Sequence, residues 1–271
     1  MKTTKTIKNK LKQTIKKRQQ EILILLYKFR FLNRKQIQKL LNQKDKKRTI
    51  EWLSDLTKNK YIIRYYSKKI DEKPAVYSLG TMGRKYFLEH KEIKDITIPL
   101  LDRVWKERNN SETSRKHWLL LADIYLSLMQ LVKSSGKGKG KLKFFTHVDL
   151  WGVKHLIRKE PDAYFTIKED NGNTKGYFLD IFDSYTQWDE IKDRIQKYFQ
   201  YFKKNSWQDY MQRPFPRIVI ISPSDRYKSI YGYIKKILIE KENGMLFYLS
   251  TWDEIQREGM SSKVLHKVET E

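Results

Sequence analysis

Within residues 1–91 the spacing of apolar side chains changes from a helical period to a strand-like one and then back to a helical one. Apolar side chains recur at helical spacing in three successive segments: residues 19–30, 33–41 and 46–59. Two short runs rich in aromatic and β-branched residues follow: 61–66 and 75–79. Gly80 and Gly83 then interrupt the pattern before a further helical stretch, residues 84–90. We therefore expect three helices, a β-hairpin and a fourth helix.

This order is the layout of a winged helix-turn-helix. In such a domain the third helix enters the major groove of DNA, and the hairpin loop, or wing, lies along the backbone. Ile50, Leu53 and Leu56 are expected to face the core from the third helix. The residues predicted to contact DNA from this helix, the turn before it and the wing are Lys44, Lys46, Lys47, Arg48, Thr49, Trp52, Arg64, Lys68, Lys69 and Lys73. The alternative is a winged helix that binds protein, with lysines that only solvate its surface.

The net charge is concentrated in the same part of the chain. The protein has 57 Lys and Arg against 32 Asp and Glu, a formal net charge of +25. Residues 1–91 hold 26 basic and 7 acidic side chains, a net +19, which leaves +6 for residues 92–271. This asymmetry indicates a polyanionic partner, which for this fold is double-stranded DNA. Residues 1–18 hold eight basic and no acidic side chains, which predicts either an arm that follows phosphates or a solubilising tail.

The composition excludes several other classes. The chain has no cysteine, so it has no disulfide and no thiolate zinc site. The longest apolar run, residues 22–27, is too short to span a membrane. The first eighteen residues lack the apolar segment of a secretory signal. We therefore expect a cytoplasmic protein without a membrane partner.

The second half of the chain alternates strand-like and helical segments. Strands are expected at residues 142–146, 162–168, 176–182, 217–222 and 244–250. Helices are expected at residues 149–158, 188–202, 224–240 and 252–257. The Asn-Gly pair at 171–172 predicts that the second and third strands form a hairpin. These segments predict a mixed sheet flanked by helices, and the fold class is α/β, or α+β over the whole chain.

Two aspartates on the expected hairpin are the candidates for chemistry. Asp162 follows Pro161 at the start of one strand, and Asp180 lies near the end of its partner. Paired carboxylates can hold a Mg²⁺ ion that activates water, which is the logic of the PD-(D/E)xK nucleases. The usual lysine is replaced by Phe182, so a cation from the next helix would have to substitute: Lys192, Arg194 or Lys197. The alternative is that both aspartates only cap turns, which leaves catalysis open.

The order of these features resembles the replication-relaxation family of bacterial plasmids and integrative elements. A winged helix is followed by a helix with His117, Leu119 and Asp123, then by Pro161-Asp162, by Asp180, and by Arg194 four residues before Tyr198. The resemblance implies a winged helix fused to a nuclease-like domain that acts in plasmid replication or mobilisation. Family members usually have Glu-x-Asp where this chain has Asp180-x-Phe182.

The predicted division of the chain follows from these features. It comprises a basic arm (1–18), a winged helix (19–91), a connecting helix with a flexible basic linker (92–141), a restriction-endonuclease-like α/β domain (142–259) and a polar tail (260–271). The leading hypothesis is a DNA-binding protein of a plasmid or other mobile element that acts in replication or its control.

Two other functions stay open. One is a Mg²⁺-dependent nuclease or nickase with Asp162, Asp180, Arg194 and Lys197 as catalytic residues and the two aspartates as metal ligands. The other is an adaptor, in which aromatic faces with Tyr198, Tyr201, Tyr231 and Tyr233 bind replication or mobilisation proteins. A homodimer is compatible with each of these functions.

Overall fold

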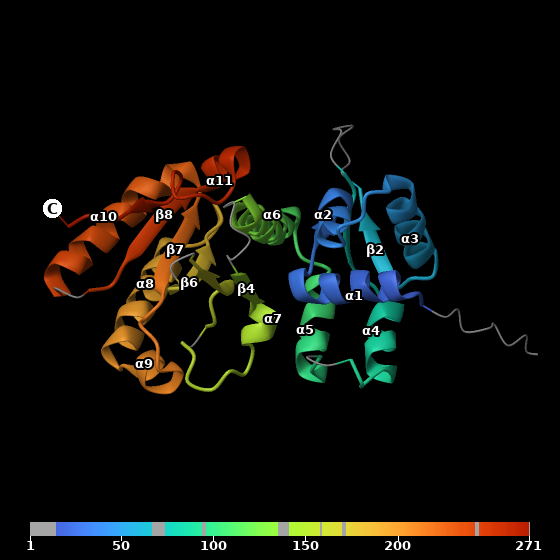
Figure 1. Ribbon diagram of the computed structural model, residues 1–271, viewed down its shortest axis with the longest axis horizontal. Helices are drawn as coiled ribbons and strands as arrows, with labels where there is room; N and C mark the ends of the chain where they lie inside the picture. Colours follow the sequence, from blue (N-terminus) through green and yellow to red (C-terminus); the bar gives the residue numbers. More distant parts are fainter. Residues whose placement is uncertain are drawn as a thin grey trace, which may run out of the picture.

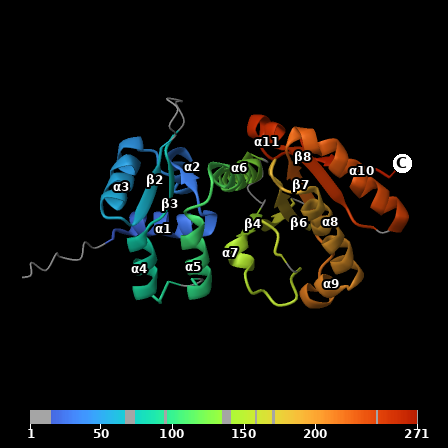
Figure 2. The same ribbon diagram turned by 180° about the vertical axis from the view of Figure 1, so that it is seen from behind.

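The structure of the protein is a computed structural model that describes residues 15–66, 74–93, 96–134, 141–157, 159–169, 172–241 and 244–270. One part is built on a three-stranded sheet and the other on a six-stranded sheet. The long helix α6 (Glu112–Ser134) lies between them (Figure 1). The view from behind shows the same order, with helices α1 to α5 on one side of α6 and the larger sheet on the other (Figure 2). The mixed α/β fold class is as expected from the sequence.

The first part has the element order of a winged helix-turn-helix. Its elements are α1 (Lys17–Phe29), β1 (Leu32–Asn33), α2 (Arg34–Leu40), α3 (Lys46–Lys58), β2 (Ile62–Tyr65), β3 (Val76–Leu79) and α4 (Thr81–Glu89). β3 lies between β1 and β2 and is antiparallel to both. The expected helices and hairpin strands are confirmed, whereas β1, with two residues, is too short to show a strand period.

Local chemistry explains where these helices begin. The side-chain oxygen of Asn33 accepts a hydrogen bond from the Gln36 amide and caps α2, as its position predicts. Gly80 and Gly83 lie against the turn that joins α3 to β2. A Cβ at Gly80 would lie 2.5 Å from the Lys60 carbonyl oxygen, and one at Gly83 would lie 2.4 Å from that of Tyr61. Only glycine therefore allows α4 to start so close to this turn.

Helix α3 packs on the core with a different face from the one expected. Ile50 is 44% exposed, whereas Thr49 is fully buried, so the expectation that Ile50 faces inward is wrong. The buried positions are Thr49, Leu53 and Leu56, which follow the i, i+4, i+7 stripe of a helix. Thr49 can be buried because its hydroxyl donates a hydrogen bond to the Asp45 carbonyl at 3.2 Å.

Two helices connect the two sheets. α5 (Ile98–Glu107) was not expected from the sequence, while α6 confirms the connecting helix expected within residues 92–141. α6 contacts α1, α2 and β1 of the first part and β4 and α11 of the second. Residues 135–140 of the expected flexible linker lie outside the described residues.

The second part is a six-stranded mixed sheet in the order β4-β5-β6-β7-β8-β9. Its strands are β4 (Lys141–Thr146), β5 (Ala163–Lys168), β6 (Thr174–Ile181), β7 (Arg217–Ser222), β8 (Phe247–Thr251) and β9 (His266–Lys267). Its helices are α7 (His147–Leu150), α8 (Trp188–Lys203), α9 (Ser206–Met211), α10 (Ser224–Lys241) and α11 (Trp252–Glu258). β5 and β6 form the expected antiparallel hairpin, and β6, β7 and β8 are parallel.

Two expectations for this part are corrected. The helix expected over residues 149–158 is wrong, because α7 ends at Leu150. Gly152 and His155 have positive φ angles of 71° and 66°, which a right-handed helix cannot contain. The segment after Gly259 is less polar than expected, since it buries Val264 and Val268 and adds β9 to the edge of the sheet.

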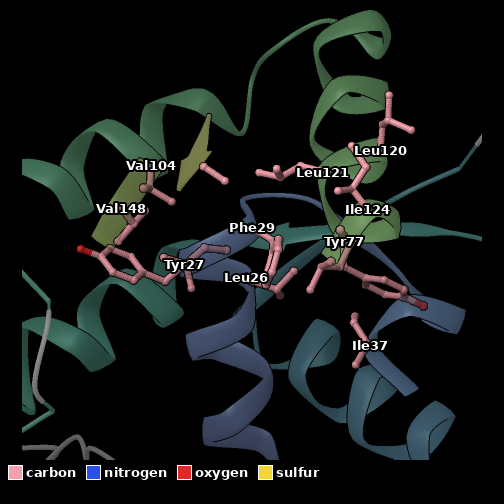
Figure 3. Close-up of a cluster of buried hydrophobic side chains, with 14 of the residues drawn as sticks. Leu26, Tyr27, Phe29, Ile37, Tyr77, Val104, Leu120, Leu121, Ile124 and Val148 are labelled. Atoms are coloured by element: carbon pink, nitrogen blue, oxygen red, sulfur yellow. The ribbon is translucent and has the colours of Figure 1, made fainter. Parts of the chain in front are cut away.

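Two hydrophobic cores cover opposite faces of the six-stranded sheet. Phe178 and Leu179 are neighbours on β6 but belong to different cores, as the alternation of a strand requires. The first core continues from the sheet through α6 into the winged helix. Figure 3 shows Leu26 and Phe29 of α1 beside Leu121 and Ile124 of α6. The second core packs the sheet against α8 and α10.

Candidate nucleic-acid interface and buried acid cluster

The start of α3 carries a group of exposed cations. Lys44, Lys46, Lys47 and Arg48 are all exposed, and none of them forms an ion pair with a described residue. Asp45, the acid among them, is occupied as the N-cap: its carboxylate accepts from the Lys47 amide at 2.8 Å and the Arg48 amide at 3.3 Å. The helix dipole adds positive potential at this end. The turn into α3 is therefore a compact cationic surface.

This surface continues into a groove between α3 and the start of α1. A cavity of about 670 Å³ is lined by Lys16, Lys17, Arg18, Arg48 and Trp52, with Glu51 and Asp55 on the α3 side. The side chain of Gln19 donates a hydrogen bond to Asp55, which holds the two helices together beneath the groove. Trp52 is half-buried and packs against the first core, so its indole supports the groove wall. The sequence places Lys16, Lys17 and Arg18 in the basic arm of residues 1–18, whereas in the structure Lys16 is the N-cap of α1 and Lys17 and Arg18 are its first residues.

The other residues predicted to contact DNA fall into three groups. Arg64 is exposed near the end of β2, and its guanidinium lies 4.3 Å from the Tyr66 ring centre. Thr49 is fully buried, so its side chain cannot reach a ligand at this surface. The three wing lysines lie outside the described residues: Lys68, Lys69 and Lys73.

Asp180 lies in a buried hydrogen-bonded cluster at the end of β6. Nε and Nη2 of Arg194 on α8 donate to its two carboxylate oxygens at 2.8 and 2.6 Å, and the Tyr198 hydroxyl donates at 2.6 Å. The same guanidinium also donates to the carbonyl oxygens of Lys159 and Glu160. Burial alone would lower the pKa of Arg194, but the charge of Asp180 raises it above its ordinary value. Burial and Asp180 together raise the pKa of Tyr198 well above its ordinary value.

Asp162 is paired with a histidine from α6. The Nε2 atom of His117 lies 3.2 Å from the Asp162 carboxylate, whose second oxygen accepts from the Ile181 amide at 2.8 Å. Burial alone would raise the pKa of Asp162, but the histidine and this amide lower it. In the same way, burial would lower the pKa of His117, and the Asp162 carboxylate raises it. Each shift favours the charged form of its group, and the pair joins α6 to the hairpin.

The three cations expected to assist these aspartates form ion pairs with different residues. Arg194 lies against Asp180, as the hypothesis of a substituted cation requires. Lys197 instead pairs with Asp193, and Lys192 pairs with Asp189 at 2.6 Å, both on α8. Helical geometry explains this, because residues three or four apart share a face. The structure thus brings Asp180 and Arg194 together and leaves the two lysines on other ion pairs.

The residues of this cluster do not fit a magnesium site as they are arranged. Both oxygens of Asp180 already accept strong hydrogen bonds from a permanent cation, and a metal ion would have to displace Arg194. Asp162 is engaged by His117 and the Ile181 amide. Among the described residues, no group of three or more His, Asp and Glu side chains could hold a metal ion. As arranged, Asp180 and Asp162 have no carboxylate oxygen pair open to a shared metal ion.

A second buried charge group connects the winged helix to the cluster. Arg30, at the end of α1, is 2% exposed, donates to Glu107 of α5 and stacks 4.2 Å from the Trp118 ring centre. Its Nη2 lies 3.5 Å from Nδ1 of His147, whose Nε2 is 3.7 Å from Glu160. Burial and Arg30 together lower the pKa of His147. Sequence reasoning missed these residues, since they are distant along the chain and belong to no motif.

The fold and these surfaces define a winged-helix protein joined to an α/β domain. Residues 23–218, well over half of the chain, match the replication-relaxation family, so the chain belongs to that family. Among solved structures, the adhesin competence repressor AdcR of Streptococcus pyogenes is similar to 44% of this chain and 82% of its own, with 18% identity and a TM-score of 0.27. A search of the curated proteins found no match. None of the described helices is long and apolar enough to cross a membrane.

Proposed function

We propose that this protein binds double-stranded DNA through its winged helix and acts in replication, or its control, on a plasmid or other mobile element. The observation that carries the proposal is the exposed group Lys44, Lys46, Lys47 and Arg48 at the start of α3. Phosphate contacts by such cations supply affinity, and the helix that enters the major groove supplies sequence readout. The replication-relaxation family to which the chain belongs supports the replication role.

The exposed face of α3 gives a second support for DNA binding. Lys47, Ile50 and Ser54 are exposed on the helix, away from the buried stripe. A cation, an apolar group and a hydroxyl are the kinds of side chain that read base edges, including the thymine methyl group. The groove with Lys16 and Lys17 lies on the α1 side of the same helix and is suited to the phosphates that flank a major groove. The buried acid cluster then has a structural role, which is to hold α8 and α6 against the hairpin.

A salt titration of duplex binding tests the proposal. The variant Lys46→Ala/Lys47→Ala/Arg48→Ala is compared with Lys228→Ala/Lys235→Ala/Lys236→Ala, which removes the same charge from α10. For three lost phosphate contacts, the slope of log K against log salt should become shallower by about 3 in the α3 variant. The α10 variant should keep the original slope. Absence of duplex binding at low salt, or equal loss in both variants, would contradict the proposal.

A further inference from the structure

A small aromatic pocket lies at the wing end of the three-stranded sheet. Asn33, Val76 and Tyr65 are paired in register across β1, β3 and β2, and they form one side of the pocket. Tyr66 and, from α6, Arg115 also line it, and its volume is about 200 Å³. Pockets for drug-sized ligands are roughly 300–1,000 Å³, so this one suits a smaller group.

The two tyrosines of this pocket are held in different ways. The Tyr65 hydroxyl donates to the Arg108 carbonyl at 2.7 Å and lies 2.9 Å from the Ser78 hydroxyl, which fixes the ring. Tyr66 is 70% exposed, an unusual exposure for so large an aromatic side chain. One rigid ring and one exposed ring beside a small pocket offer a surface on which a planar group can stack.

Cations lie beside both rings. The Arg115 guanidinium is 4.6 Å from the Tyr65 ring centre, and that of Arg64 is 4.3 Å from the Tyr66 ring centre. Arg115 forms no ion pair with a described carboxylate, whereas Lys116 next to it lies 4.0 Å from Glu112. Aromatic rings with interleaved arginines are the arrangement that binds single-stranded nucleic acid, because every base has a face to stack and every phosphate a charge.

We propose that this pocket binds an unpaired nucleobase of a single-stranded DNA segment that extends from the bound duplex. The base stacks on Tyr66 above the Tyr65 side of the pocket, and Arg64 and Arg115 contact the adjoining phosphates. The inference rests on the proposed duplex binding. It specifies the ligand further, as a duplex that carries a single-stranded extension. A protein that acts in replication would meet such DNA wherever the strands of its site open.

The test uses the full chain with four DNA ligands: a blunt duplex, the same duplex with a short thymine tail, the same tail without bases, and the single strand alone. The thymine tail should tighten binding about tenfold, and the abasic tail should not. Tyr66→Ala should abolish this gain and leave blunt-duplex binding unchanged, while Tyr66→Phe should keep it. Tyr185→Ala, which removes a ring that is 71% exposed in the other part of the molecule, is the control and should keep the gain.

The outcomes separate this inference from the proposed function. If the blunt duplex binds but the tail gains nothing, or Tyr66→Ala keeps the gain, the pocket inference is overturned and the duplex proposal stands. An equal gain from the abasic tail would likewise overturn it, because phosphates alone would then explain the effect. If the duplex does not bind, Tyr66-dependent binding of the single strand still supports the pocket, and its absence overturns the inference.

Discussion

At the scale of single residues, the Asp180 carboxylate is buried together with its counter-charge, the Arg194 guanidinium. The side chains of Asp180 and Arg194 are 5% and 11% exposed, so each would be costly without the other. Arginine suits this place because its planar fork bonds both carboxylate oxygens and also the Lys159 and Glu160 carbonyls. A lysine has a single nitrogen and could not make these bonds together. The arrangement explains why arginine, and neither Lys192 nor Lys197, lies beside Asp180.

The pair of His117 and Asp162 makes stability depend on pH. The folded pKa of His117 lies above its ordinary value of 6.5. The contribution of His117 to the free energy of unfolding is therefore complete below pH 6.5 and is lost as pH rises through the folded pKa. The folded pKa of Asp162 lies below 3.8, so the pair weakens at the acid end only as pH falls below that value. We expect His117→Gln to lower the free energy of unfolding by about 3 kcal/mol at slightly acid pH and by less as pH rises. Urea unfolding from about pH 5 to about pH 9 measures this difference.

His147→Gln is the matched control for this pH series. Burial and Arg30 lower the pKa of His147 in the folded state, so its neutral form is the one that folding favours. The difference between wild type and His147→Gln should therefore be complete above pH 6.5 and shrink as pH falls below that value toward the folded pKa, opposite to the His117 series. The same pH trend in both variants would contradict the assigned partners.

At the scale of elements, substitutions of Asp45, the N-cap of α3, should change the stability of the protein and its affinity for DNA in different ways. Asp45→Asn keeps a side-chain oxygen that can cap, and we expect little change in the free energy of unfolding. Asp45→Ala removes the two hydrogen bonds to the Lys47 and Arg48 amides and should cost about 1 kcal/mol. Both variants remove a negative charge beside four exposed cations, so both should bind duplex DNA more tightly at low salt. Urea unfolding and duplex titration check the two effects separately, and looser binding by Asp45→Asn would argue against this surface.

The same elements show what could be predicted from the sequence. The sequence predicts the helices that have a long apolar period, such as α3 and α8, and the strands that turn residues bound, such as β5 and β6. β1 and β9 have two residues each, too few for any period. The inward face of α3 was misassigned because a buried threonine looks polar until its hydroxyl has a partner. The ion pair of His117 with Asp162 spans 45 positions, and no local spacing predicts such a contact.

At the scale of the whole molecule, the first core makes α6 the centre of the protein. The sequence predicts a boundary at residues 91–92 and a linker up to 141, yet α6 contributes Leu121 and Ile124 to a core that also holds Leu26 of α1 and Val219 of β7. The ion pairs of Arg30 with Glu107 and of His117 with Asp162 cross the same region. Movement of the winged helix against the larger sheet would expose this core, so we expect the two parts to unfold as one cooperative unit.

Hydrogen exchange tests this cooperativity. Leu121 is fully buried, and Leu121→Ala should lower the free energy of unfolding by about 2–5 kcal/mol through the cavity that it leaves. If the core is shared, the most protected amides of α1 and of β7 should lose the same protection free energy. The control variant is Leu131→Ala, on the same helix, where the side chain is 40% exposed. It should change the protection free energies of α1 and of β7 by less than about 0.5 kcal/mol each. Loss of protection in α1 with β7 unchanged would instead mean that the winged helix unfolds as an independent domain, because a separate core in the larger sheet would then remain intact.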